Sequence, residues 1–265
     1  MWRSAIWITT GLSTIWAAEA LAQAASPSPV AAPTAATAPA VPAFSAVAPG
    51  AAVPGWRAVG LPKGKAPMTR IDTVADADPA ASPARTVLRL QTDASYGNWV
   101  FDHAPWAPPR SAGLQWRWRL QQPLPGADLR RKDRDDAALK VCVMFDHPIE
   151  RVPFWERNLL RLARAVSGEA LPAATVCYVW DATLARDTAL PNAHSPRVRY
   201  LVLRGNEAAP GAWQSEQRPI WADFLRLFGD ESDRVPAIIG LAVGADSDNA
   251  LGRSLAFVGD IRWAP

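Results

Sequence analysis

The chain has 265 residues, of which 49% are hydrophobic and 20% are charged, and this composition excludes a collagen, a wholly disordered chain and a small disulfide-rich protein. The formal net charge of +3 is too small to indicate a nucleic acid as partner. Thirteen Trp against three Tyr is an unusual aromatic composition, and it raises the question of where the indole rings lie.

Residues 1–24 are expected to be a secretory signal peptide. Arg3 precedes an apolar stretch over residues 5–18, and Ala22-Gln23-Ala24 is the small-x-small pattern that signal peptidase cleaves. Polar residues interrupt the stretch, so it falls short of the roughly 20 apolar residues that cross a bilayer. We therefore expect a periplasmic or secreted protein that has no transmembrane segment once the signal is removed.

Residues 25–54 contain 12 Ala, 7 Pro and no charged residue. Proline at this density breaks helices and alanine offers little surface to bury, so the segment is predicted to be a disordered tether. Residues 55–265 then form the folded domain, which is large enough for one core without a metal.

Beyond residue 55 the dominant hydrophobic period is two. Residues 114–120 place Leu, Trp, Trp and Leu on one face and Gln, Arg and Arg on the other, which is typical of a half-buried antiparallel strand. Similar apolar runs bounded by Pro, Gly and Asp lie at 86–91, 98–101, 139–145, 175–180, 197–203, 237–243 and 255–263. The pattern predicts an all-β domain, an antiparallel β-sandwich of jelly-roll type.

Two segments have helical periodicity. In residues 154–166 an apolar stripe that runs from Trp155 to Val166 lies opposite Arg157, Arg161 and Arg164. We expect this stripe to cover an open end of the sandwich, with docking on a partner or a membrane as the alternative. Residues 221–228 form the second, shorter helix and should pack on a sheet.

Cys142 and Cys177 are the only cysteines, and each lies within a predicted strand. In an exported protein they can form a disulfide, provided that strands 139–145 and 175–180 are neighbours. The alternative is two small buried apolar residues.

Two acidic clusters lie where strands meet loops. Asp135 and Asp136 precede the strand at 139, and Asp246, Asp248 and Asn249 follow the strand that ends near 243. Oxygen-rich loops of this kind can bind Ca²⁺, but the position where an EF-hand needs Glu is Phe257, so an EF-hand is excluded. A different Ca²⁺ site and simple turn capping both stay open.

Several ordered motifs between Trp116 and Trp263 resemble a bacterial family of domains of unknown function, DUF3047. They are Leu114-Gln115-Trp116-Arg117-Trp118, Asp135-Asp136, Tyr178-Val179-Trp180, Arg218 with Asp223, Phe228-Gly229, Asp246-Ser247-Asp248-Asn249 and Gly259-Asp260-Ile261. The helix at 154–166 and the Ala/Pro segment depart from the family pattern. The resemblance implies a secreted β-sandwich, similar to jelly-roll carbohydrate-binding modules, with no established activity.

The leading hypothesis is a non-catalytic glycan-binding module, because sugar rings stack on aromatic side chains while carboxylates and amides bind their hydroxyls. The expected site comprises Asp135, Asp136, Trp180, Asp246, Asp248 and Asn249, with Arg218 and Asp223 as a supporting ion pair. Trp116, Trp118, Trp155 and Trp221 follow periods that point inward, so the indole rings expected near a ligand are Trp99, Trp106, Trp180 and Trp213.

Two alternatives belong to other classes. A glycan-active hydrolase would use Asp136 and Asp248 as paired carboxylates. A structural or interaction protein of the envelope would dock through the helix at 154–166. No phosphate-binding glycine loop, metal-ligand spacing or nucleophile motif supports another chemistry.

Overall fold

The computed structural model describes residues 37–76 and 85–265. The predicted signal peptide and the first part of the predicted tether lie outside these residues. Within the described ranges, no helix is long and apolar enough to cross a membrane.

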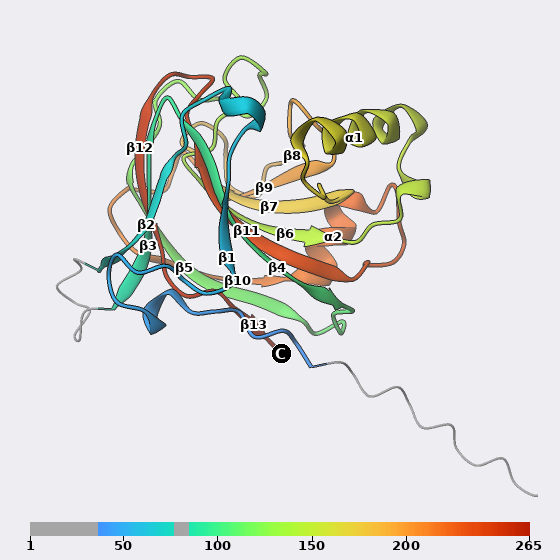
Figure 1. The fold of residues 1–265 in the computed structure, drawn as a ribbon, viewed down its shortest axis with the longest axis horizontal. Helices are drawn as coiled ribbons and strands as arrows, with labels where there is room; N and C mark the ends of the chain where they lie inside the picture. The colour runs from blue at the N-terminus through green and yellow to red at the C-terminus, as the bar shows by residue number, and fades with distance from the viewer. Residues whose placement is uncertain (1–36, 77–84) are drawn as a thin grey trace, which may run out of the picture. The chain divides into compact units, whose positions relative to one another are not determined.

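Two β-sheets stack as the layers of a sandwich (Figure 1). The first has seven strands in the order β1 (Trp56–Val59), β4 (Tyr96–Trp106), β11 (Ile238–Asp246), β6 (Leu139–Phe145), β7 (Ala174–Trp180), β9 (Val198–Arg204) and β8 (Ala189–Pro191). The second has the order β10 (Gln214–Pro219), β5 (Gly113–Gln122), β12 (Arg253–Val258), β3 (Thr86–Asp93) and β2 (Arg70–Ala75), and β13 (Arg262–Ala264) also pairs with β5.

The alternation of residues along each strand produces the core between the sheets. In β6, Leu139, Val141, Val143 and Phe145 belong to the main core cluster, which also contains Trp116 and Trp118 of β5 from the other sheet. Residues Cys142 and Met144 of β6 point the other way and belong to a second cluster on the outer face of the seven-stranded sheet. The apolar surface removed from water between the sheets is the main stabilising contribution to this fold.

The predicted all-β class and all eight predicted strands are confirmed, and β12 and β13 together replace the run at 255–263. The four strands that the sequence did not predict are β1, β8, β10 and β2, which are the edge strands of the two sheets. An edge strand buries few side chains, so its sequence lacks the alternation that indicates a strand. One pair departs from the predicted antiparallel arrangement, because β7 and β9 are parallel.

Both predicted helices form, as α1 (Phe154–Ser167) and α2 (Ile220–Phe228), besides the short 3-10 turns η1 (Phe44–Ala46), η2 (Pro62–Gly64) and η3 (Ile149–Arg151). Helix α2 contacts β7 of one sheet and β10 of the other, and its Phe224 and Phe228 are fully buried. Helix α2 therefore covers an end of the sandwich, which is the position that the sequence analysis expected for the helix at 154–166.

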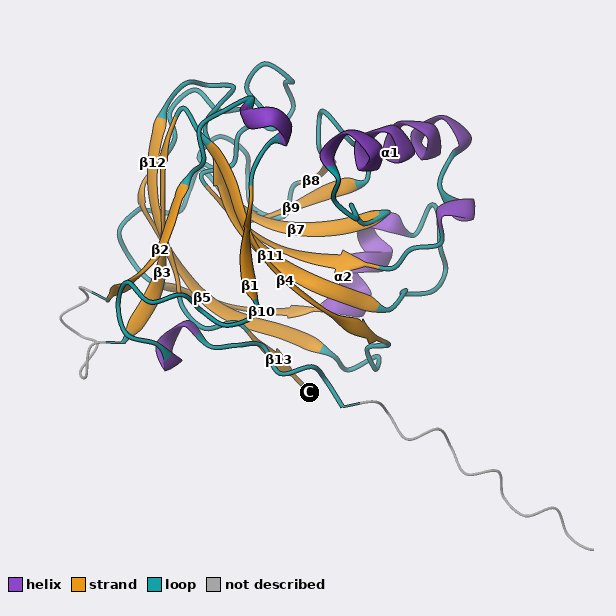
Figure 2. Cartoon of the chain, in the orientation of Figure 1, coloured by secondary structure: helices purple, strands orange, loops and turns teal. Residues whose placement is uncertain are grey.

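The prediction for the first helix was wrong about its packing. Helix α1 lies outside the sandwich, near β9 and the edge strand β8 of the seven-stranded sheet (Figure 2). Of its apolar side chains only Leu160 is buried, while Trp155 is 72% exposed. The helix is held through the other face, where Arg157 donates to the carbonyls of Glu150 and Val152.

The prediction of a disordered tether was wrong for residues 37–54. Phe44 and Val53 are buried in the main core cluster, and Val41 and Val47 pack against it. The side chain and backbone N–H of Ser45 both donate to the carboxylate of Asp260. The high Ala and Pro content concealed a few large apolar residues, so the packed domain extends further towards the N-terminus than residue 55.

The expected disulfide is present between Cys142 and Cys177. The two residues face each other in the antiparallel pair β6–β7, so the predicted neighbourhood of the strands is confirmed. Closing a loop of 35 residues stabilises the fold by about 3–4 kcal/mol in the chain-entropy treatment.

Replacing Phe44 by Ala should destabilise the domain by about 3–5 kcal/mol, because a fully buried ring is lost and the cavity can close only partly. Urea unfolding of the two proteins measures this difference. Thr37→Ala, at an exposed position of the same segment, is the control and should leave the free energy of unfolding unchanged. A loss below about 1 kcal/mol for Phe44→Ala would contradict the packing of this segment.

Candidate functional site

A cavity of about 680 Å³ lies on the outer face of the seven-stranded sheet. Its floor is made by the outward side chains of the central strands, including Val100 of β4, Met144 of β6 and the Cys142–Cys177 disulfide. Ala163 of α1 and Leu171, just after that helix, line it from one side. Most of this wall is apolar, and the polar groups collect at one end.

The polar end forms where two acidic segments meet. Strand β11 pairs antiparallel with β6, with Gly244 opposite Lys140, so the end of β11 lies beside the start of β6. Asp246 and Ala137 exchange two hydrogen bonds there: the backbone N–H of Asp246 donates to the Ala137 carbonyl at 3.0 Å, and the N–H of Ala137 donates to Asp246 Oδ1 at 2.9 Å. The convergence of the two predicted clusters is therefore a consequence of strand pairing.

Asp136 holds the loop that follows β11. Its Oδ1 accepts from the backbone N–H of Asn249 at 3.2 Å and from the side-chain amide of Asn249 at 3.1 Å, and its Oδ2 accepts from the N–H of Ala250. Asp136 is 1% exposed and is not among the described residues that line the cavity. Its carboxylate therefore links the segment before β6 to the loop after β11.

Lys140 supplies a positive charge to the acidic end. Its Nζ donates to Asp246 Oδ1 at 2.9 Å and lies 5.2 Å from the centre of the Tyr96 ring. Burial disfavours the charged ammonium, but Asp246, Tyr96 and Tyr200 outweigh this effect, so the pKa of Lys140 is raised. Burial also raises the pKa of Asp246, and the charge of Lys140 opposes that rise.

Asp135 and Asp248 both line the cavity. Asp135 Oδ2 accepts from the side-chain amide of Asn192 at 2.5 Å, whereas Asp135 Oδ1 and Asp248 Oδ1 are buried atoms with no hydrogen-bond partner among the described residues. Burial and repulsion from Asp246 raise the pKa of Asp135 to about 6. Burial, together with Asp246 and Asp136, also raises the pKa of Asp248.

The same carboxylates fit Ca²⁺ poorly. One oxygen each of Asp136, Asp246 and Asp248 lies within 4.8 Å of the others. Asp136, however, uses both oxygens for the loop, and the ammonium of Lys140 already occupies one side of Asp246. The carboxylates of Asp246 and Asp248, beside the ammonium of Lys140, do not supply the six to eight oxygens that Ca²⁺ prefers.

Three of the predicted site residues lie elsewhere. Trp180 is 2% exposed and packs against Trp118 in the core, because it shares the inward face of β7 with Tyr178. Arg218 and Asp223 do form the predicted ion pair, at 2.6 Å and 2.9 Å. Asp223 also accepts from the hydroxyl of Tyr178, so this pair joins β10, α2 and β7 inside the fold.

The other indole rings do not face the cavity either. Trp106 is buried, and the partly buried Trp99 packs against the core. The guanidinium groups of Arg117 and Arg119 lie over the Trp213 ring, at 4.3 Å and 5.0 Å from its centre. None of the four expected Trp residues is among those that line the cavity, so the Trp excess gives no support to a sugar site there.

The sequence reasoning missed four polar or aromatic residues of the acidic end: Tyr96, Lys140, Asn192 and Tyr200. One of them carried a signal, because Lys140 is a lone charge within the otherwise apolar run 139–145. A buried lysine needs a carboxylate partner, which the sequence could have indicated. The other three come from distant strands and loops and carried none.

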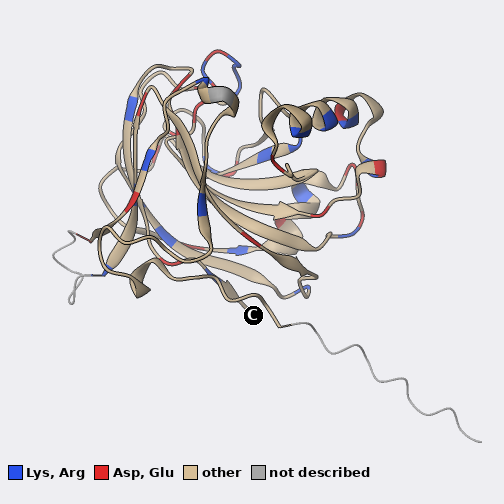
Figure 3. Ribbon diagram, in the orientation of Figure 1, with Lys and Arg blue, Asp and Glu red and all other residues tan. Residues whose placement is uncertain are grey.

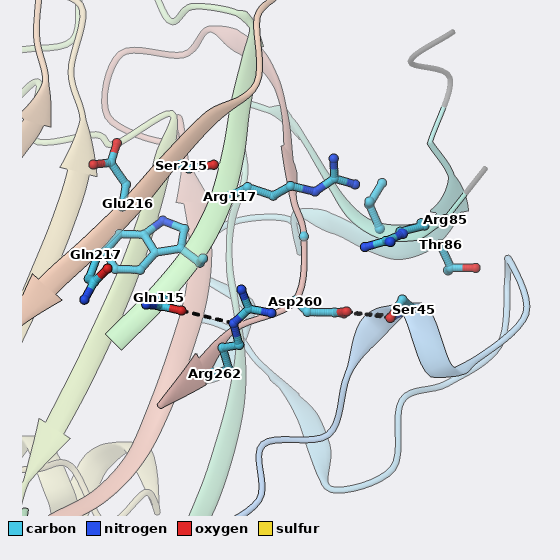
Figure 4. Close-up of a pocket in the computed structure, with 13 residues that line it drawn as sticks. Ser45, Arg85, Thr86, Gln115, Arg117, Ser215, Glu216, Gln217, Asp260 and Arg262 are labelled. Atoms are coloured by element: carbon cyan, nitrogen blue, oxygen red, sulfur yellow. Dashed lines mark hydrogen bonds between the residues drawn. The ribbon is translucent and has the colours of Figure 1, made fainter. Parts of the chain in front are cut away.

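A second hollow of about 320 Å³ lies outside the six-stranded sheet (Figure 4). Its polar groups are largely engaged with one another, since Asp260 accepts from Ser45 and Arg262 donates to Gln115 at 3.1 Å. It contains none of the predicted site residues. We regard it as the place where the N-terminal segment packs on β3 and on the turn between β12 and β13.

Comparison with known proteins gives one family and only distant structural likenesses. The family described as "Protein of unknown function (DUF3047)" matches residues 54–262. No curated protein matches in sequence.

Among solved structures, the catalytic domain of Humicola grisea Cel12A is 10% identical with a TM-score of 0.37, over 79% of this chain and 92% of that one. The K1 adhesin domain of Lys-gingipain from Porphyromonas gingivalis is 8% identical with a TM-score of 0.35, over 84% and 95%. The enzymatically active domain of tailspike protein 4 from bacteriophage CBA120 is 9% identical with a TM-score of 0.36, over 80% of this chain but only 19% of that one. Likenesses at this level are too weak to indicate a function.

Asp136→Asn should destabilise the domain by roughly 2–3 kcal/mol, because an amide nitrogen cannot accept from the loop N–H groups that the carboxylate now satisfies. Thermal and urea unfolding measure the loss. Asp133→Asn is the matched control, since Asp133 belongs to the same acidic run but is exposed and pairs only with Arg131. Equal stability of the Asp136 variant and the wild type would contradict the stabilisation of the loop by the Asp136 carboxylate.

The stability of the domain should fall because of Asp135 as pH rises from 3.8 to about 6. The native pKa lies above that of the unfolded chain, so the native state binds the proton more tightly, and this advantage disappears on ionisation. The melting temperature of Asp135→Asn relative to wild type should therefore increase between about pH 4.5 and pH 7.5. Asp133→Asn should show no such increase, because the Arg131 guanidinium lowers the pKa of Asp133. A pH-independent difference for Asp135→Asn would contradict the raised pKa.

Proposed function

The chain belongs to the DUF3047 family, and we propose that this member is a non-catalytic glycan-binding protein whose site is the acidic end of the outer-face cavity. The observation that carries the proposal is a pair of buried carboxylate oxygens, Asp135 Oδ1 and Asp248 Oδ1, that have no partner in the part of the chain that the structure describes. A buried acceptor without a hydrogen bond destabilises the protein until a donor reaches it, and sugar hydroxyls are donors.

The rest of the cavity suits the same ligand class. Its volume is within the range of about 300–1,000 Å³ that small-molecule sites occupy. Lys140 lies at the acidic end, where its ammonium has more N–H groups than its bond to Asp246 uses, and the rings of Tyr96 and Tyr200 border this end. The apolar floor offers a surface for the C–H face of a sugar ring. The apolar floor thus takes the role that the sequence analysis gave to Trp180.

We propose the periplasm or the cell exterior as the location. The expected signal peptide at residues 1–24 is the main support. The Cys142–Cys177 disulfide agrees with this location, since such bonds persist mainly in oxidising compartments.

The test is a glycan array with the purified protein, followed by calorimetric titration of the oligosaccharide that binds best. Asp135→Asn and Asp248→Asn should each weaken binding about tenfold or more, because a buried charge-assisted hydrogen bond is lost. Asp133→Asn should bind as the wild type does. Parallel titrations in CaCl₂ and in EDTA should agree, because the carboxylates fit Ca²⁺ poorly. Absence of binding to every glycan, or equal binding by all the variants, would refute the proposal.

A glycan-active hydrolase is the second candidate, and one observation favours it. Asp135 lines the cavity with a pKa raised to about 6, which suits a general acid, and Asp248 lines the same cavity. Asp136 is unsuited to the role expected of it, since its carboxylate is engaged with the loop. Release of reducing ends from a bound glycan by the wild type, and its loss in both Asp135→Asn and Asp248→Asn, would favour hydrolysis over simple binding.

A further inference from the structure

Helix α1 turns its apolar side to solvent. Five of the eight large apolar side chains that are exposed in the described residues belong to this one helix. They form what we term the α1 stripe: Phe154 (73% exposed), Trp155 (72%), Leu159 (48%), Leu162 (61%) and Val166 (50%). Positions four, seven and eleven residues after Trp155 lie along one side of a helix, so the side chains make one continuous apolar strip.

The orientation of the helix is fixed by its polar side. Glu156 pairs with the buried Arg197 at 2.6 Å, and Arg164 donates to the carbonyl of Leu171 at 2.8 Å, as Arg157 does to carbonyls near the helix start. Leu160 completes the attachment in a small apolar cluster with Val152 and Ala173. These contacts hold the α1 stripe outward, so rolling the helix over to bury the stripe would break them.

The helix also carries positive charge that no acidic side chain balances. In the described parts of the chain, Arg157, Arg161 and Arg164 take part in none of the ion pairs, whereas the one acidic residue of the helix, Glu156, is neutralised by Arg197. Figure 3 shows the basic positions spaced along α1. Arg161 is exposed and lies seven residues after Phe154, so these two side chains lie on the same side of the helix.

We infer that α1 docks the domain on the surface of an anionic lipid bilayer, with the α1 stripe inserted at the level of the headgroups. An apolar face with Trp and Phe beside uncompensated Arg is the composition of a helix that lies in the interface plane. Arg161 is free to reach anionic headgroups while the apolar side chains leave water. Arg157 and Arg164 stay bound to backbone carbonyls, which do not neutralise them, so their charges add to the attraction. This surface is separate from the acidic cavity and does not depend on what the cavity binds.

The size of the stripe argues against a second copy of the chain as its occupant. A helix of 14 residues is about 21 Å long and about 10 Å wide, which gives a footprint on the order of 200 Å². A stable protein interface needs about 800 Å² on each partner. Two copies would also bring their unbalanced arginines together. A bilayer has no such size requirement and offers the opposite charge.

The experiment reports on the helix itself. The two native cysteines are bridged, so Leu162→Cys in the full chain provides a single thiol for an environment-sensitive nitrobenzoxadiazole label. Vesicles of phosphatidylcholine with phosphatidylglycerol should shift the emission of this label to the blue, and vesicles of phosphatidylcholine alone should do so much less. Leu251→Cys is the matched control, because Leu251 is 76% exposed and belongs to the loop between β11 and β12, so its label should not respond.

Two further variants test the two parts of the inference. Leu159→Glu in the labelled protein should weaken the vesicle response about tenfold or more, through loss of one buried apolar side chain. Arg161→Glu should weaken it and reduce its dependence on salt. Both positions are exposed, so unchanged thermal unfolding is expected and verifies that the variants fold.

Three outcomes would overturn the inference. The first is a label at position 162 that responds to neither kind of vesicle. The second is a response without vesicles that grows with protein concentration, which would identify a second copy as the occupant. The third is an equal response to both kinds of vesicle, which would refute attraction to anionic lipid.

Discussion

The hydrogen bonds of the Asp136 carboxylate are the constraint on which the rest of the site depends. They join the segment before β6 to the loop after β11, two parts of the chain more than 100 residues apart. With this loop fixed, Asp248 faces the same cavity as Asp135, and Asp246 meets Lys140. A flexible loop would let these carboxylates separate and take their partners from water. These hydrogen bonds therefore keep Asp135 and Asp248 at the same cavity.

Strand alternation divides the chemistry of the molecule between two faces of one sheet. Residues with odd numbers in β6 enter the core, and those with even numbers supply Lys140, Cys142 and Met144 to the cavity. In β7 the same alternation places Cys177 in the cavity floor and sends Tyr178 and Trp180 to the core. Asp223 therefore serves as a buried partner of Tyr178 and Arg218 and does not contact a ligand in the cavity.

The helices show why an amphipathic pattern does not identify what it packs against. Both α1 and α2 have an apolar side, but α2 places Phe224 and Phe228 in the core while α1 exposes Trp155. The difference arises from partners far along the chain, namely Arg197 for Glu156 and backbone carbonyls for Arg157 and Arg164. Polar attachment of this kind leaves no trace in the helix sequence itself. The apolar face of α1 is therefore free to meet something outside the domain.

The amino-acid sequence by itself determined the all-β class, the eight inner strands, both helices and the family, because alternation and helical periodicity are local properties of the chain. It also predicted that Asp135, Asp136, Asp246, Asp248 and Asn249 belong to one site. Only the tertiary structure decided that Trp180 is core, that Phe44 and Val53 anchor the N-terminal segment, and that Cys142 faces Cys177. Each of these depends on which strands are neighbours and on which face of the sheet a residue lies. Those relations arise from contacts between distant parts of the chain, which a local pattern does not encode.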